Sequence, residues 1–382
     1  MDAITPQMFG AKADGITDDT EAFQKAVDSG YDVYIPSAQN EKYLITNTIK
    51  ITNSGCKRIF SEPICRMVST GLIRVDFRNA ENPRETSLFE VHTELLHIGG
   101  IKFYCEADDH RVGTFINAMD EDVCDYDIRI EHCSIKNFYK VAKFTGRGFE
   151  IVDSHVGSCN YLADLYWDDE KDSNDNHPAC YDQRGINIKN CRLHNIASAF
   201  FTVKSGHVYG LHFQGNTVDN GKGYLVRAYD QAYGWNISGN VIQGIRGSFD
   251  VMDFRGGMCD CVISGNTFIS DVGYWVGTTD TVNSWIKSGD YTVSCIISNN
   301  VFKNAESNFM TFKHIDGSVI SGNAMHNETN SMASAIKITG LCRKNSITSN
   351  TVLSGKEQPM FSKTIPKNNS VAGNYPNSVA VC

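Results

Sequence analysis

Three charged side chains in the middle of the sequence lie at corresponding positions of a repeat. Arg227, Asp253 and Lys287 each stand thirteen residues before a repeated asparagine, and Tyr229 and Arg255 stand eleven before it. An aspartate flanked by cations can act as an acid or a base, and arginines bind carboxylate or hydroxyl groups. This set suits a sugar-binding face with acid–base chemistry. The alternative is a surface charge ladder in which Arg227 and Lys287 sandwich Asp253.

The elements that position these residues follow from the repeat itself. A short apolar strand, a Gly-Asn or Asn-Asn turn and one large apolar residue recur at intervals of 23 to 34 residues, anchored at Asn216, Asn240, Asn266, Asn300, Asn323, Asn350 and Asn374. Such a period is typical of a solenoid, in which each coil buries its apolar face against its neighbours. The asparagines are interpreted as turn residues whose amides bond to the next coil.

Alternation around each asparagine distinguishes strand from helix. Apolar residues lie three before and two after it, with small polar residues between them, which is the period of a β-strand. Earlier coils place Cys133, Ser154 and Cys191 near the asparagine position. The column thirteen residues before the anchors contains Val203, Arg227, Asp253, Lys287, Met310 and Lys337. Adjacent coils are about 4.8 Å apart, so neighbours in this column can touch.

The N-terminal segment predicts a cap for the solenoid. Asp18 and Glu21 have the spacing of a capping box ahead of a short helix over 19–28, and 33–37 then supplies a first strand. An amphipathic helix is the expected cover for an open first coil. We expect residues 1–50 to form this cap with the first strands, and 51–382 to form the coils.

Two stretches interrupt the regular coils, near 160–183 and near 273–288. The first surrounds Trp167 with carboxylates, which gives Asp168 and Asp169 as candidates for contact with a substrate; a solvated acidic loop is the alternative. Hydrolysis of a glycoside generally needs a second carboxyl group beside Asp253. Asp230, one coil earlier but three residues further along, could supply it, as could Asp168 or a neighbouring subunit. The phase of the repeat places Trp235 in the core. The other tryptophans lie in loops or strand entries and are better candidates for stacking on sugar rings: Trp167, Trp275 and Trp285.

Composition excludes several classes of protein. A net charge of -9 argues against a nucleic-acid surface. The sequence contains no apolar run of eighteen residues, which argues against a membrane-spanning helix. The thirteen cysteines show no zinc spacing, and several fall where a small apolar residue would stack, so free thiols are expected rather than disulfides. We expect no metal and no cofactor.

The entry segment resembles a known family. Phe9-Gly10-Ala11, Asp14-Gly15, Asp18-Asp19-Thr20 and Ala22-Phe23, followed by a strand ending at Pro36, resemble the start of pectate-lyase-like right-handed parallel β-helices, in particular phage tailspike and tail-fibre polysaccharide depolymerases. The resemblance implies an all-β, single-stranded right-handed parallel β-helix with a capping helix. In that family the acidic pair Asp18-Asp19 belongs to the cap, so we interpret it as structural.

The same resemblance implies a function. It suggests a component of the virion tail, made in the bacterial cytoplasm, that binds a capsule or O-antigen and cleaves it, with the carboxylate surplus favouring hydrolysis. Asp253 is then the principal acid, with Asp230 or Asp168 as the second, and the substrate contacts are Arg227, Tyr229, Arg255, Lys287, Trp167 and Asp169. A lyase acting on uronate-containing polysaccharide and a non-catalytic adhesin remain alternatives. Tailspikes imply a homotrimer, and because no long N-terminal head is evident, we expect a shortened chain or attachment through a tail or adaptor protein.

Overall fold

The computed structural model describes residues 3–36, 42–65, 68–69, 71–106, 111–120, 123, 125–165, 183–203, 208–245, 247, 249–270, 282–328, 334–354, 360–362 and 365–375. Contacts divide the chain into unit 1 (Met1–Ala197) and unit 2 (Ser198–Cys382), and each is described by itself. The boundary near residue 50 stays a prediction for the limit of the cap.

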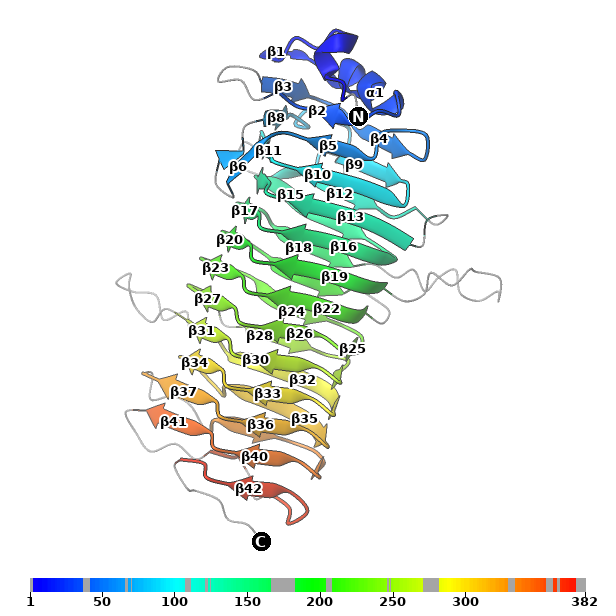
Figure 1. The fold of residues 1–382 in the computed structure, drawn as a ribbon. Coiled ribbons are helices and arrows are strands. Elements are labelled where there is room, and N and C mark those ends of the chain that lie inside the picture. Colours follow the sequence, from blue (N-terminus) through cyan, green and yellow to red (C-terminus); the bar gives the residue numbers. More distant parts are fainter. Residues whose placement is uncertain are drawn as a thin grey trace. The chain divides into compact units, whose positions relative to one another are not determined.

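The strands of unit 1 lie in three parallel stacks, with successive coils adding strands to them (Figure 1). Stack I contains β4 (Ile49–Thr52), β9 (Ser87–His92), β12 (Val112–Ala118), β15 (Phe138–Phe144) and β18 (Tyr161–Leu165). Stack II contains β2 (Val33–Tyr34), β5 (Arg58–Phe60), β10 (Leu95–Gly99), β13 (Asp125–Glu131), β16 (Arg147–Val152) and β19 (Gln183–Lys189). Stack III contains β1 (Asp14–Asp18), β3 (Lys42–Ile45), β8 (Gly71–Val75), β11 (Ile101–Cys105), β14 (Ser134–Lys136), β17 (His155–Gly157) and β20 (Arg192–His194). The strands β6 (Pro63–Cys65) and β7 (Val68–Ser69) form a separate antiparallel pair.

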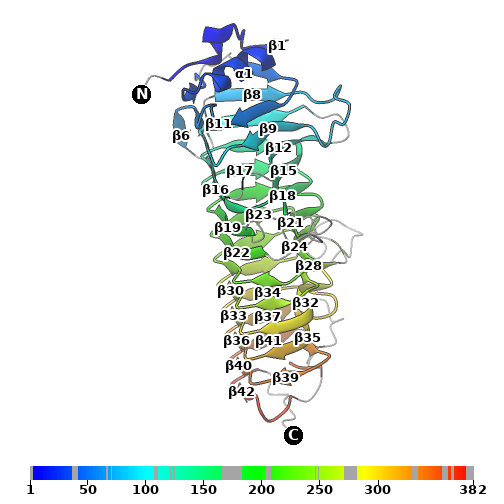
Figure 2. The same ribbon diagram turned by 90° about the vertical axis from the view of Figure 1, so that its right-hand side faces the viewer.

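Unit 2 repeats this arrangement, and Figure 2 shows its stack I strands β21, β24 and β28 in succession. Stack I contains β21 (Ala199–Val203), β24 (Tyr224–Ala228), β28 (Asp250–Phe254), β32 (Ser284–Val293), β35 (Met310–Asp316) and β38 (Ile336–Ile338). Stack II, which β32 and β35 also reach, contains β22 (Val208–Gln214), β25 (Ala232–Tyr233), β26 (Asn236–Ser238), β29 (Met258–Cys259), β30 (Val262–Ser264), β33 (Ile296–Ser298), β36 (Val319–Ser321), β39 (Cys342–Arg343), β40 (Ser346–Thr348) and β42 (Ser370–Ala372). Stack III contains β23 (Thr217–Asp219), β27 (Val241–Gln243), β31 (Thr267–Ile269), β34 (Val301–Lys303), β37 (Ala324–Asn327) and β41 (Thr351–Ser354). The predicted right-handed parallel β-helix is confirmed as the fold of both units.

Burial patterns explain why the strands form and distinguish stack I. In β13, Tyr126, Ile128 and Ile130 are buried while the alternating polar residues face outward, as one-sided burial requires. All five residues of β21 and all five of β28 are buried. The outward side chains of β21 and β28 are therefore shielded from solvent, whereas other strands of stack I, such as β38, keep an exposed residue.

The asparagines form the predicted ladder between coils. Asn300 donates from Nδ2 to the carbonyl of Ile263 at 2.8 Å, and its Oδ1 accepts from the backbone N–H of Asn266 at 3.0 Å. In unit 1 the backbone N–H of Cys133 donates to Ser154 Oγ at 3.1 Å, which confirms that these residues take the asparagine position. Each rung thereby satisfies buried backbone groups at a turn.

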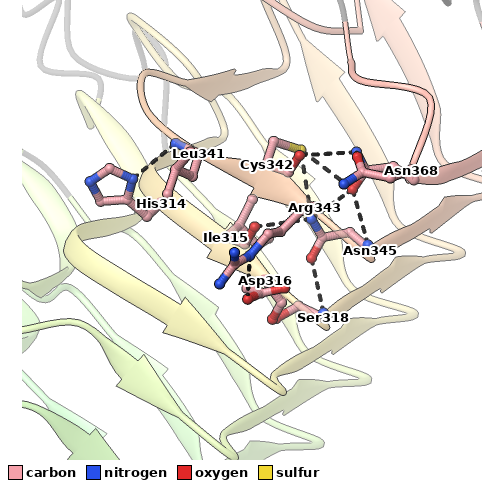
Figure 3. Close-up of polar contacts among 10 residues, drawn as sticks. His314, Ile315, Asp316, Ser318, Leu341, Cys342, Arg343, Asn345 and Asn368 are labelled. Carbon is pink, nitrogen blue, oxygen red and sulfur yellow. Dashed lines mark hydrogen bonds and ion pairs between the residues drawn. The ribbon is translucent and has the colours of Figure 1, made fainter.

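A second polar corner accompanies stack II near the C-terminal coils (Figure 3). Asn345 accepts from the backbone N–H of Ser318 at 2.9 Å and donates to the carbonyl of Ile315 at 3.1 Å. Beside it, Arg343 Nε donates to Asp316 Oδ2 at 2.7 Å. These contacts join successive coils at a corner that the sequence repeat did not single out.

The N-terminal cap is confirmed as a helix, but its details differ from the prediction. Helix α1 (Thr20–Asp28) follows Asp19 as N-cap, and it covers the first coils of unit 1 (Figure 1). The predicted Asp18/Glu21 capping box is wrong, because Glu21 pairs with Lys25 and Asp18 bonds instead to Thr20 and Thr46. The first strand is β1, ahead of the helix, after the short 3₁₀ helix η1 (Pro6–Phe9).

Asp19 shows why the acidic pair is structural. Its side chain is buried and accepts the backbone N–H groups of Lys12 at 2.6 Å and Ala13 at 3.2 Å. The carboxylate thus fixes the entry segment against the helix start. Among the nine cysteines whose side chains the structure describes, none forms a disulfide.

Candidate functional site

The predicted charged column lies on stack I of unit 2. Strand pairing places Arg227 beside Asp253 and Asp253 beside Lys287, on β24, β28 and β32. The central part of the sequence column is therefore confirmed as a set of neighbours. The column is wrong by one residue at Val203 and at Met310, which are buried, and Thr202 and Thr311 take these positions in register. Lys337 is in register with Thr311, as predicted.

Asp253 is a buried carboxylate with one engaged oxygen. Its residue exposure is 4%, and Oδ2 accepts from Arg255 Nε at 2.9 Å. Its Oδ1 is buried and has no hydrogen-bond partner among the described residues. The carboxylate stabilises the cation beside it, so the hydrogen bond from Arg255 to Asp253 raises the pKa of the arginine.

Lys287 does not complete the predicted sandwich. Its Nζ pairs with Asp250 Oδ2 at 2.8 Å, whereas its backbone is in register with Asp253. Asp250 also accepts from Asn283 Nδ2 and Ser284 Oγ, each at 2.6 Å, and the hydrogen bond to this carboxylate is the first cause of the raised pKa of Lys287. Asp250 is the first residue of β28 and lies two positions before Met252, in the alternating set that the repeat assigns to the inside. The outward column that was followed in the sequence therefore did not include it.

Aromatic rings organise the two arginines. The guanidinium of Arg227 lies 4.7 Å from the ring centroid of Tyr224 and 5.5 Å from that of Tyr229. The guanidinium of Arg255 lies 4.7 Å from the ring centroid of Tyr229, which belongs to the preceding coil. Tyr229 is 40% exposed, so this part of the cluster reaches solvent. Cation–π stacking holds the guanidinium planes while leaving their edge N–H groups for other acceptors.

The second acid is less well placed than the first. Asp230 follows β24 at a bend, and a Cβ built on Gly256 would lie 2.3 Å from its carbonyl carbon. Asp230 thus sits against the backbone three residues beyond Asp253, in agreement with its offset in the sequence. The other predicted contacts lie outside the described residues: Asp168, Trp167, Asp169 and Trp275.

The two remaining tryptophans are both core residues. Trp235 is 1% exposed, as its phase predicts. The assignment of Trp285 to sugar stacking is wrong: it is fully buried, donates to the carbonyl of Asn304 at 3.0 Å and packs on Phe268 with ring centroids 5.3 Å apart. Residues 284–288 belong to the strand β32, so this part of the second predicted excursion is regular coil.

Unit 1 contains a separate polar cleft of about 820 Å³. Its lining includes four carboxylates, of which Glu85 pairs with Lys140 at 3.5 Å and with Lys143, and Asp76 pairs with Arg78 at 2.8 Å. These ion pairs leave the lining of the cleft polar, while the charges of Glu85 and Asp76 are compensated by neighbouring cations. No group of three metal-ligating side chains occurs within the described part of the chain, and no helix there is long and apolar enough to cross a membrane.

Comparison with known proteins places this geometry in context. No family model matches the chain. Over 51 residues it is 47% identical to the pre-neck appendage protein of Bacillus phage B103, a segment that covers 13% of this chain and 6% of that protein. The Dettilon tailspike protein superposes with a TM-score of 0.55 at 15% identity, covering 98% of this chain and 68% of the tailspike.

The fold is that of phage tailspikes. It is equally that of β-helix enzymes, since DFA-IIIase from Arthrobacter chlorophenolicus A6, without its lid, superposes with a TM-score of 0.60 at 11% identity, covering 97% of this chain and 98% of that one. The expected resemblance to tailspikes and pectate-lyase-like β-helices is thus confirmed for the fold. At these identities the fold alone is shared, and the site must be argued from its own residues.

Proposed function

We propose that this chain is part of a phage tail appendage that binds a bacterial surface polysaccharide and cleaves it by glycoside hydrolysis. The observation that supports the proposal is the state of Asp253. This buried carboxylate is held by Arg255 through one oxygen, its other oxygen has no partner among the described residues, and cations flank it on neighbouring coils. A saccharide crossing several coils would find an acid–base group beside guanidinium and phenol groups that position sugar.

In the proposed reaction, water adds across the glycosidic C–O bond. Asp253 protonates the leaving oxygen or activates the water, and Asp230 or Asp168 supplies the complementary carboxyl group. Arg227, Arg255 and Lys287 position the sugar together with Tyr229, while Trp167 and Asp169 contribute from the predicted excursion. The similarity to pre-neck appendage and tailspike proteins supports a place in the virion tail and an action at the host surface.

A lyase is the second candidate, and one observation favours it. Tyr229 is exposed and lies between the guanidinium groups of Arg227 and Arg255. A phenol in this setting could abstract the proton beside a uronate carboxylate while the cations stabilise the developing charge. Such an elimination leaves a conjugated double bond in one product, whereas hydrolysis leaves two saturated ends.

The test is incubation with a panel of purified capsules and O-antigens, followed by mass analysis of the fragments. Asp253→Asn should lower turnover on the identified substrate by about 10²-fold or more, as expected for a general acid or base. The matched control is Asp316→Asn, because Asp316 also pairs with an arginine in unit 2 but lies at the corner of Figure 3. Wild-type turnover by Asp253→Asn, with folding confirmed by circular dichroism, would refute its catalytic role; binding without fragments would indicate an adhesin.

A further inference from the structure

The charged side chains on stack I of unit 2 form a cluster in which one cation has no ion-pair partner among the described residues. Three cations, Arg227, Arg255 and Lys287, gather there with two carboxylates. Arg255 is paired with Asp253 at 2.9 Å and Lys287 with Asp250 at 2.8 Å. Across the described ranges, Arg227 makes no ion pair with a carboxylate. Among these three cations, Arg227 is therefore the one without an ion-pair partner within the described residues, on a chain whose net charge is -9.

The side chain of Arg227 is held in place without satisfying its donors. Its guanidinium stacks on Tyr224 and Tyr229, and these aromatic contacts restrict its orientation. Its Nε is buried and has no acceptor within the residues that the structure describes. Buried donors are normally hydrogen-bonded, so an orphaned one beside a candidate binding site is a place where an acceptor from a ligand would be favourable.

Two buried acceptors lie on the neighbouring rungs. Thr202, in register with Arg227, is 7% exposed, and its Oγ1 has no partner among the described residues. Asp253, in register on the other side, is 4% exposed with an unpartnered Oδ1. Three consecutive rungs about 4.8 Å apart thus present a hydroxyl, a cationic donor and a carboxylate oxygen.

We infer that Arg227 binds a carboxylate of the polysaccharide, so that the substrate class is an acidic polysaccharide with a uronic acid or similar sugar in its repeating unit. This inference rests on the function proposed above. The planar guanidinium matches a carboxylate through two parallel N–H···O bonds, and its fixed stack reduces the entropy lost on binding. A hydroxyl of the same or the adjoining sugar bonds with Thr202 Oγ1, while Asp253 Oδ1 stays available for the acid–base step.

The experiment measures binding of the full chain by calorimetry to oligosaccharides of hyaluronan, alginate and polygalacturonate, each beside its carboxyl-reduced form. Dextran and dextran sulfate serve as neutral and sulfated probes. At least one acidic probe should bind about tenfold or more tightly than its reduced form, and added salt should weaken this preference. Arg227→Gln should abolish the preference, and Arg227→Lys should retain only part of it because lysine lacks the fork.

Lys337→Gln is the matched control, because Lys337 is an exposed cation on stack I two rungs beyond Lys287. It should bind every probe as the wild type does. The inference fails if no acidic probe is preferred, if Arg227→Gln behaves like Lys337→Gln, or if dextran sulfate matches the uronates with the same dependence on Arg227. Cleavage of a neutral polysaccharide that depends on Asp253 would leave the proposed function standing and remove this inference, whereas binding of no polysaccharide at all would remove both.

Discussion

Truncation of one ladder asparagine should loosen unit 2 locally and by a large amount. Asn300 is fully buried and takes part in four side-chain hydrogen bonds. Two are donated, to the carbonyl of Ile263 and to Asn323 Oδ1, and two are accepted from Asn266. Asn300→Ala removes all four and leaves a buried backbone N–H and a buried C=O without their side-chain partner.

The magnitude follows from the number of bonds. At roughly 0.5 to 1.5 kcal/mol net for each, the loss in the free energy of unfolding is about 2 to 6 kcal/mol. Because a solenoid is stabilised mainly between neighbouring coils, the effect should be concentrated around this rung. Since 1.4 kcal/mol is a factor of ten, amide hydrogen exchange that occurs through opening of these coils should accelerate by about 30-fold or more.

Hydrogen exchange followed by mass spectrometry can test this rung by rung. Peptides around Asn266, Asn300 and Asn323 should lose protection, and peptides of unit 1 provide the internal reference. The control is Ser298→Ala, two residues before Asn300 at a partly exposed position, which should change stability by no more than about 0.5 kcal/mol. If Asn300→Ala changes exchange no more than this control, or changes unit 1 equally, the structural role given to the ladder is wrong.

Two further predictions concern protonation and assembly. His155, stacked on His194 with ring centroids 4.6 Å apart, has its pKa lowered to about 4, first by burial and then by the neighbouring imidazole. Between pH 6.5 and about 4 the unfolded chain binds a proton that the folded chain does not, so stability should fall as the pH is lowered through this window, and His155→Gln should remove that part of the slope. An NMR titration giving an ordinary pKa for His155 would contradict this. For assembly, the resemblance to tailspikes predicts a homotrimer, so light scattering at micromolar concentration should give three times the 42.4 kDa chain mass; a monomer would count against it.

The sequence predicted the coils and part of the site for one physical reason. Side chains in a parallel stack are fixed by register, and register is set by a repeat that can be counted. That is why the neighbours Arg227, Asp253 and Lys287 and the core position of Trp235 were predicted correctly. Where a coil gains or loses a residue between the strand and the asparagine, counting fails: Thr202 lies fourteen residues before its asparagine and Thr311 twelve, so the column slipped by one at Val203 and at Met310.

The sequence by itself therefore determined the β-helix, the helical cap and which rungs carry charge, because these depend on local periodicity. Tertiary structure decided which charges meet. Lys287 pairs with Asp250 rather than with Asp253, and Trp285 packs on Phe268 in the core. The partners of such long side chains depend on the direction in which each side chain leaves its strand and on its burial. The burial of Asp253, and the lack of an acceptor for Arg227 Nε among the described residues, likewise depend on packing that no linear spacing contains.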